Sequence, residues 1–325
     1  MRKFVSALAL SLPLSLLAGV TTVQAEETLS IATGGTGGVY YPIGGGLAEM
    51  IGRHIPGYTG VAEVTGASVE NMGLIHREDS DLAIALADSV YKAYHGEGVF
   101  KGRKVADVRA LGSVYPNAVQ LVTLADSGIN TLSDLKGKRV SLGAPGSGTE
   151  VNARTLLEAN GIKVADLNAR RLNFNETGDA LRDGDIDAGF WSVGPPTSSI
   201  LSLATSRAIK IISISEQEIA KAIKAEPVFA PYTLRAGLYE GVDKPVQTLS
   251  IPNVLTVNAS MSDELAYQIT KMLFERVEEL RAIHSAANDT TVEFSLTSTP
   301  IPLHPGALRY YREIGKKIPE RLLLK

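Results

Sequence analysis

Two glycine-rich loops are the segments best suited to bind a small molecule. Each loop, at 33–38 and at 143–148, stands between an apolar strand and the start of a helix. Glycines let a ligand approach the backbone closely, and a helix N-terminus presents unpaired N–H donors and the positive end of the helix dipole. The two loops therefore predict a site that holds a carboxylate or phosphate without an arginine, with tight strand-to-helix turns as the alternative explanation.

Neither loop has the residues that a nucleotide site needs. The segment Gly143–Thr149 has the glycine spacing of a P-loop, but Thr149 occupies the position of the required lysine. The segment Gly35–Tyr40 lacks the third glycine of the dinucleotide fingerprint. No nucleotide cofactor is expected.

The case for a catalytic function is incomplete. Ser147 lies on a sharp strand-to-helix turn, as the nucleophile of many hydrolases does, but Pro145 replaces the first glycine of the G-x-S-x-G elbow. The five histidines are scattered and form no metal-binding pair, and the lack of cysteine excludes thiol catalysis, disulfides and thiolate metal sites. A secreted hydrolase that uses Ser147 remains the alternative to a binding protein; no catalytic residue, metal or cofactor is expected.

Four aromatic side chains at expected strand ends or helix starts are candidates for the walls of a binding cleft. They are Tyr40, Tyr41, Tyr115 and Trp191. Clefts of α/β proteins gather ligands at such positions, with ordinary core packing as the alternative. Asp88 follows the strand expected at 81–86, where its carboxylate could receive an ammonium group or hold a loop.

Alternating short apolar strands and longer amphipathic helices must position these residues. This alternation predicts an α/β fold with mostly parallel sheets. Two separate strands, 108–114 and 119–124, are expected on either side of Tyr115–Asn117. One long helix is expected to run from its cap, Ser262, to Ile283.

The order of these elements predicts two domains. A second α/β unit begins near Val119, and a strand at 253–257 returns to the first unit. We expect one domain to comprise 26–118 and 252–325, and the other to comprise 119–251. Two chain crossings would then form a hinge, a layout that suits capture of a ligand by closure.

The first 25 residues predict a cleaved secretory signal peptide. Arg2 and Lys3 precede the apolar run Phe4–Leu17, and Val23–Ala25 supplies small residues at the positions that a signal peptidase reads. The apolar run is shorter than the ~20 residues that span a bilayer. We therefore expect a periplasmic protein. Its formal net charge of -3, with no basic cluster, disfavours binding to nucleic acid.

Six stretches, in order along nearly the whole chain after the signal peptide, carry a resemblance to a known family. They are Gly35–Gly44, Gly66–Asn71, Asp134–Val140, Gly146–Thr149, Asp185–Phe190 and Leu303–Ala307. At these residues the sequence resembles the TAXI family, the solute receptors of one class of tripartite ATP-independent periplasmic (TRAP) transporters. The resemblance implies a two-domain, type II-like periplasmic-binding-protein fold with a hinge and an inter-domain ligand cleft, and no catalysis.

The resemblance also implies a ligand, a partner and a site. Known relatives bind glutamate and similar small dicarboxylates or amino acids, so the implied ligand is a small carboxylate and the implied partner is a TRAP-type membrane permease. The implied ligand-binding residues are Thr36, Gly37, Gly38, Tyr40, Tyr41, Ser68, Asp88, Gly146, Ser147, Gly148 and Thr149, with Tyr115 and Trp191 as walls. Leu86 stands where many relatives have glutamine, which reduces the polarity of the site and leaves the exact solute open.

Overall fold

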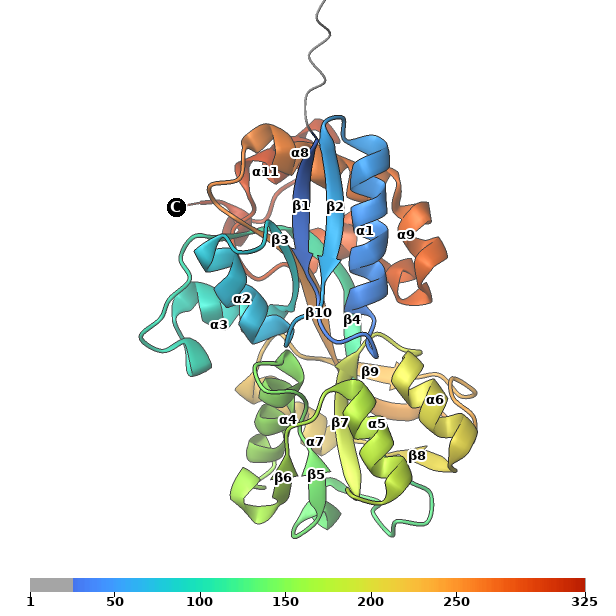
Figure 1. Ribbon diagram of the computed structural model, residues 1–325. Helices are drawn as coiled ribbons and strands as arrows, with labels where there is room; N and C mark the ends of the chain where they lie inside the picture. Colours follow the sequence, from blue (N-terminus) through green and yellow to red (C-terminus); the bar gives the residue numbers. More distant parts are fainter. Residues whose placement is uncertain (1–25, 325) are drawn as a thin grey trace, which may run out of the picture.

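The computed structural model describes residues 26–324, and the signal peptide expected at 1–25 lies outside the described residues. Figure 1 shows two lobes, one above the other, each with strands at its centre and helices around them. The fold mixes helices and strands, which confirms the α/β class that the sequence predicts.

The upper lobe of Figure 1 contains the N-terminal elements, in which strands and helices alternate. They are β1 (Glu27–Ala32), α1 (Tyr40–His54), β2 (Tyr58–Glu63), α2 (Ser68–Arg77), β3 (Leu82–Leu86) and α3 (Ala87–His95). The last helices of the chain return to this lobe. They are α8 (Asp263–Glu275), α9 (Val277–Ile283), α10 (Val292–Ser298) and α11 (Pro305–Glu313).

The lower lobe holds the middle of the chain. Its elements are β5 (Arg139–Ser141), α4 (Gly148–Ala159), β6 (Asn168–Arg170), α5 (Phe174–Asp183), β7 (Ala188–Val193), α6 (Ser198–Ser206), β8 (Ile209–Ile211), α7 (Glu216–Ala225) and β9 (Ala230–Leu234). Polar side chains begin several of these helices: Ser147 caps α4, Asn173 caps α5 and Ser215 caps α7.

Two long strands, β4 (Val108–Leu124) and β10 (Val246–Asn258), belong to both lobes and pair with each other in antiparallel orientation. Within their ladder Pro116 faces Pro252, and the register shifts between Pro252 and Val254. Because proline donates no N–H, the backbone ladder is weakened at this point.

The weakened point lies between the two lobes. β10 pairs with β3 of the upper lobe from Asn253 onwards, whereas β4 pairs with β7 of the lower lobe from Ala118 onwards. The facing prolines fall between these two ladders, so they occupy the natural position for bending.

The strands form one sheet in the order β2-β1-β3-β10-β4-β7-β5-β6, with β8 beside β4 and β9 beside β10. β1 is parallel to β2 and β3, and β5 is parallel to β6 and β7. β4 and β10 are antiparallel to their partner strands. The parallel pairing that the sequence predicts is thus confined to the two ends of the sheet.

Two expected element boundaries are wrong. β4 is one continuous strand and is not divided at Tyr115–Asn117, because its pairing with β10 continues on both sides of Pro116. The helix expected from Ser262 to Ile283 is divided at Arg276 into α8 and α9. The division lets Ile283 pack against Gly46 of α1, where any Cβ would overlap the isoleucine side chain.

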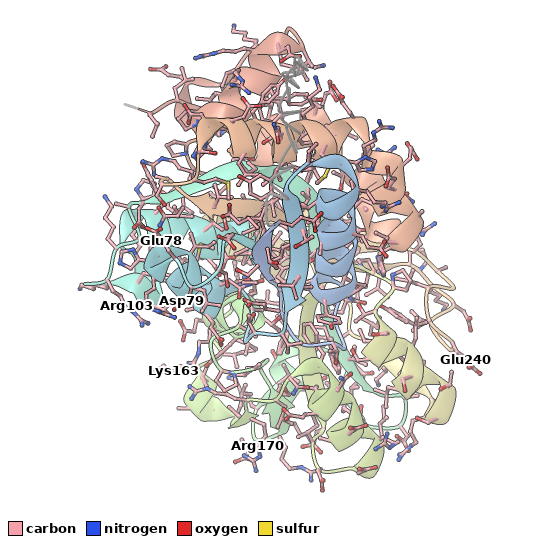
Figure 2. All side chains as sticks on the ribbon, turned by 45° about the horizontal axis from the view of Figure 1, so that its top comes forward. Glu78, Asp79, Arg103, Lys163, Arg170 and Glu240 are labelled. Atoms are coloured by element: carbon pink, nitrogen blue, oxygen red, sulfur yellow. The ribbon has the colours of Figure 1, made fainter. Side chains whose placement is uncertain are left out.

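Charged side chains of both signs lie on the outside of both lobes. Figure 2 shows six of them, all exposed: Glu78, Asp79 and Arg103 from the upper lobe, and Lys163, Arg170 and Glu240 from the lower lobe. Across residues 26–324, no helix has the length and apolar character that crossing a bilayer would require.

Candidate ligand-binding site

A cavity lies between the two lobes, and both contribute to its wall. Its volume is about 50 Å³, room for about four water-sized groups at ~10–15 Å³ each. Six residues of the expected site line this cavity: Gly38, Tyr40 and Ser68 from the upper lobe, and Ser147, Gly148 and Thr149 from the lower lobe. The cavity therefore brings together the ends of both glycine-rich loops.

Four helices begin at the cavity wall. Tyr40, Ser68, Gly148 and Phe174 are the first residues of α1, α2, α4 and α5, and all four line the cavity. Each N-terminus offers N–H groups without an intrahelical partner and the positive end of a helix dipole. Because two of these helices come from each lobe, a small anion in the cavity would be held from both sides.

The N-terminus of α1 is free of competing groups. Its cap residue, Val39, makes no side-chain hydrogen bond, and no acidic residue stands in the first turn. Pro42 has no N–H, which leaves Tyr40 and Tyr41 as the donors of the first turn. The Tyr41 side chain does not line the cavity and is 37% exposed at the surface.

The N-terminus of α4 is partly occupied by its own loop. The Ser147 Oγ accepts a hydrogen bond from the Glu150 N–H at 3.1 Å, and the Ser147 N–H donates to the Ala144 carbonyl at 3.1 Å. The N–H groups of Gly148 and Thr149, the first two residues of the helix, are the donors that this end can offer to a ligand.

The two lobes approach each other closely at Gly148. A Cβ on Gly148 would lie 2.6 Å from Leu86 Cδ1 and 2.7 Å from Ser68 Oγ, both in the opposite lobe. Leu86 also lines the cavity. The absence of a side chain at Gly148 therefore lets the two lobes approach each other this closely.

The polar groups of the wall are neutral. None of the described residues that line the cavity has a charged side chain. The Tyr40 hydroxyl donates to Asn253 Oδ1 at 2.5 Å, and burial raises the pKa of Tyr40 far above its ordinary value, so the phenol stays protonated. The Ser68 Oγ accepts from the Leu86 N–H at 3.1 Å. The Ser192 Oγ is buried and has no hydrogen-bond partner within the described structure.

Tyr115 and Trp191, expected as aromatic walls, are fully buried and do not line the cavity. The Trp191 ring stacks on Phe174 with ring centroids 6.1 Å apart, and its Nε1 donates to Ser199 Oγ at 3.1 Å. Since β7 is buried along its whole length, Trp191 packs beneath α5 and α6. Phe174 is the aromatic side chain that reaches the cavity from the lower lobe, and Trp191 supports it from behind.

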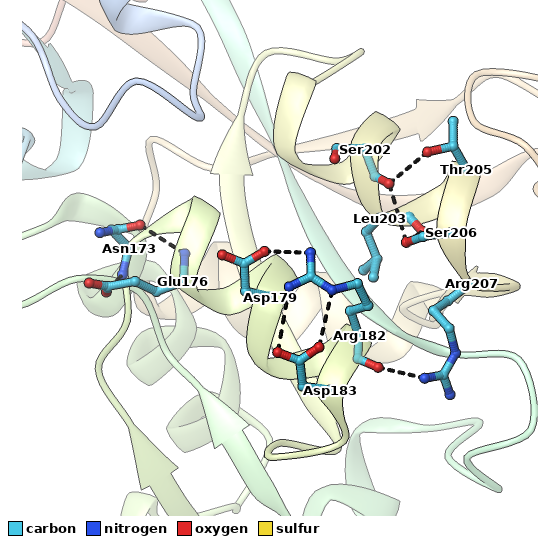
Figure 3. A network of polar contacts seen from close by, with 10 residues as sticks. All are labelled: Asn173, Glu176, Asp179, Arg182, Asp183, Ser202, Leu203, Thr205, Ser206 and Arg207. Atoms are coloured by element: carbon cyan, nitrogen blue, oxygen red, sulfur yellow. Dashed lines mark hydrogen bonds and ion pairs between the residues drawn. The ribbon is translucent and has the colours of Figure 1, made fainter.

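The start of α5, which sequence reasoning missed, carries a recognisable signal. Asn173 and Glu176 form a capping box, in which the Glu176 N–H donates to Asn173 Oδ1 at 3.0 Å (Figure 3). The Asn173-x-x-Glu176 spacing could have located this helix start. No comparable signal marks Phe174, because an apolar residue in a first turn is usually part of the core.

Three residues of the expected site hold the lobes together and do not line the cavity. They are Thr36, Gly37 and Gly146. Asn175 Nδ2 donates to Thr36 Oγ1 at 3.3 Å, and the Ser199 hydroxyl donates to the Gly37 carbonyl at 2.9 Å. The Gly146 carbonyl accepts from the Val69 N–H at 3.0 Å. Both loops therefore contact the opposite lobe directly.

Asp88 belongs to a second, charged contact between the lobes. It is fully buried on α3, and its Oδ2 accepts from Asn152 Nδ2 of α4 at 2.9 Å. Lys92 Nζ lies 3.7 Å from Asp88 and 2.5 Å from Glu226 Oε2 at the end of α7. We call these four residues, Asp88, Lys92, Asn152 and Glu226, the inter-lobe cluster. None of the four lines the cavity.

The ionisation of the inter-lobe cluster follows from its burial. Burial raises the pKa of Asp88 to about 6, although Lys92 opposes the shift. Burial alone would lower the pKa of Lys92, but the carboxylates of Asp88 and Glu226 outweigh it and raise that pKa. Lys92 thus stays charged near neutral pH.

Across residues 26–324, no group of three His, Cys, Asp or Glu residues is arranged to hold a metal ion.

Two lobes joined by two crossing strands, with a cavity between them, agree with the periplasmic-binding-protein fold that the family resemblance implies. The chain belongs to the NMT1-like family, whose model matches residues 31–315.

Solved structures that are similar to this chain share little sequence with it. A protein of Bordetella bronchiseptica is 17% identical, with a TM-score of 0.54, over 88% of this chain and 89% of that one. A Listeria monocytogenes protein, provisionally named as an L-cystine ABC transporter, is 13% identical, with a TM-score of 0.51, over 83% and 98%. The periplasmic aliphatic sulphonate binding protein SsuA of Escherichia coli is 14% identical, with a TM-score of 0.46, over 90% and 96%. The likeness to the Bordetella and Listeria structures, with TM-scores above 0.5, shows the fold alone.

Proposed function

We propose that this chain is a periplasmic receptor that captures a small carboxylate between its two lobes and delivers it to a membrane transporter. The observation that carries the proposal is the meeting of four helix N-termini, two from each lobe, at a cavity without a charged side chain. Backbone donors and helix dipoles can hold an anion in place of a salt bridge. Membership of the NMT1-like family and the solute-binding fold support the same function.

Catalysis by Ser147 is not part of this proposal. Its hydroxyl accepts the Glu150 N–H and so serves as the cap of α4. Its backbone is extended, with φ -86° and ψ 151°, and none of the described residues that line the cavity is a histidine. A serine nucleophile needs an adjacent base, which this wall does not provide.

We infer that the lobes correspond to 26–118 with 252–325 and to 119–251, and that they close about the facing prolines of β4 and β10. Only the closed form can use helix N-termini from both lobes, so a ligand should favour it. Small-angle scattering of the mature protein should therefore show a smaller radius of gyration at saturating solute. An unchanged radius in a sample that binds solute by calorimetry would contradict capture by closure.

Two classes of membrane transporter are candidates for the partner that receives the solute. The resemblance to the TAXI family supports a TRAP-type permease, which an ion gradient drives. The name of the Listeria structure makes an ABC-type importer the second candidate. Solute uptake by spheroplasts supplied with this protein distinguishes them, because collapse of the ion gradients stops the first and ATP depletion stops the second.

The signal peptide gives a separate prediction about secretion. The small residues that end at Ala25 should direct cleavage before Glu26. The intact mass of protein recovered from the periplasm should match a chain that begins at Glu26. A mass that retains the first 25 residues would count against export by this route.

A further inference from the structure

The wall of the cavity favours negative charge. Four helix N-termini point their positive ends towards it, and α1 and α4 retain uncommitted first-turn donors. Among the described residues that line the cavity, none is an aspartate or glutamate. The acidic residues in the first turns of α2, α4 and α5, which are Glu70, Glu150 and Glu176, do not line the cavity. The wall itself therefore favours negative charge and presents no carboxylate to a cation.

A second observation, independent of the helices, is a buried hydroxyl without a partner on a residue that lines the same cavity. Ser192, on β7, lines the wall and is 5% exposed, yet its Oγ has no hydrogen-bond partner. The backbone of Ser192 is already engaged, since its carbonyl accepts from Asn117 Nδ2 at 3.0 Å and its N–H donates to Thr149 Oγ1 at 3.4 Å. A buried hydroxyl left without a partner is costly, and a ligand oxygen would remove that cost.

The carboxylate that could have received an ammonium group is committed elsewhere. Asp88 is the acidic residue that sequence reasoning placed in the site, but it does not line the cavity. It accepts from Asn152 at 2.9 Å and lies 3.7 Å from the Lys92 ammonium, which supplies its counter-charge. An ammonium group on the ligand would thus be removed from water without an acidic partner, at the positive ends of four helices.

We propose that the cavity selects small carboxylate anions that lack an ammonium group, called oxyacids below, and rejects the corresponding α-amino acids. This inference rests on the proposed function and narrows its ligand class. The oxyacid gains charge-assisted hydrogen bonds from the backbone donors and from Ser192, whereas the amino acid brings the same carboxylate together with an uncompensated positive charge.

Calorimetry on the mature protein with matched ligand pairs tests this selection. Suitable pairs are lactate with alanine, succinate with aspartate, and 2-oxoglutarate with glutamate, all at pH 7.5. In any pair that binds, the oxyacid should bind at least 100-fold more tightly than its amino acid. An amino acid that binds within tenfold of its oxyacid, or binds alone, overturns the inference and leaves the solute-binding function standing. If no member of either class binds, the proposed function itself falls, and the inference falls with it.

Two variants of Ser192 test separately its hydrogen bond to the ligand and the selection against amino acids. Ser192→Ala keeps the wall neutral and removes only the hydroxyl, so oxyacid affinity should fall at least tenfold while the discrimination against the amino acid persists. Ser192→Asp places a carboxylate in the wall, so the preference between the two members of a pair should reverse. Thermal melts of both variants establish that they are folded. Unchanged oxyacid affinity in a folded Ser192→Ala protein would overturn the role of Ser192, and the wild-type pairs decide the selection if Ser192→Asp does not fold.

Discussion

Replacing Gly148 by alanine should lower ligand affinity at least tenfold without weakening the fold. The new Cβ would lie 2.6 Å from Leu86 Cδ1 and 2.7 Å from Ser68 Oγ across the cleft, so the lobes could not close fully. The backbone N–H of residue 148 is retained, and alanine at the first position of a helix is favourable. Calorimetry should therefore show the loss of affinity, and scattering should show a weaker contraction with ligand.

The matched control for this variant is Gly52→Ala. Gly52 also lies in a helix, α1, but a Cβ there would meet nothing within 4 Å. The Gly52→Ala protein should bind ligand normally. Gly148→Pro is informative beside Gly148→Ala, because proline suits the first helical position but also removes the N–H donor. Normal binding and contraction by Gly148→Ala would show that the bound lobes do not meet at this residue.

Replacing Lys92 by methionine should have the second large effect. The variant leaves Asp88 and Glu226, both buried, without the cation that lies between them in the closed form. Removing one partner of a buried ion pair costs about 3–5 kcal/mol. Part of this cost can be avoided by protonation or by opening of the lobes, so we expect at least a tenfold loss of affinity at pH 8.

The loss should be smaller at pH 5. The pKa of Asp88 is already raised by burial from 3.8 to about 6 with Lys92 present, and loss of the cation raises it further. A carboxyl whose pKa is raised on closure takes up a proton as the lobes close, so closure of the variant is favoured at low pH and disfavoured as the pH rises through that pKa. Calorimetry at both values measures the difference, with the exposed Lys317→Met as the control. Equal binding by wild-type and Lys92→Met protein at pH 8 would show that the inter-lobe cluster does not stabilise closure of the lobes.

Local sequence patterns were sufficient for the parts of the site that depend on neighbouring residues. Strand, glycine-rich loop and helix start follow one another within each loop, and the structure places Gly38 and Gly148 at the same cavity. The α/β class and the return of the chain to its first lobe follow from the order of the elements in the same way.

The roles that were not foreseen depend on residues distant in the chain. The sequence left open whether Asp88 receives an ammonium group or holds a loop, because nothing near it in sequence indicates Glu226, which shares its lysine across the cleft. Trp191 was assigned to the wall because its position at a strand end is visible, whereas the packing of Phe174 over its ring is not. The pairing of β4 with β10 on both sides of Pro116, which keeps β4 continuous, likewise requires the register between two strands.

The central claim is that helix N-termini from both lobes hold one small anion. A crystal structure of the mature protein with its bound solute tests it most directly. Carboxylate oxygens are expected within hydrogen-bond distance of the N–H groups of Tyr40 or Tyr41 on one side and of Gly148 or Thr149 on the other, with Ser192 Oγ as a further donor. A solute anion bound to one lobe alone, or paired with an arginine or lysine side chain, would contradict it.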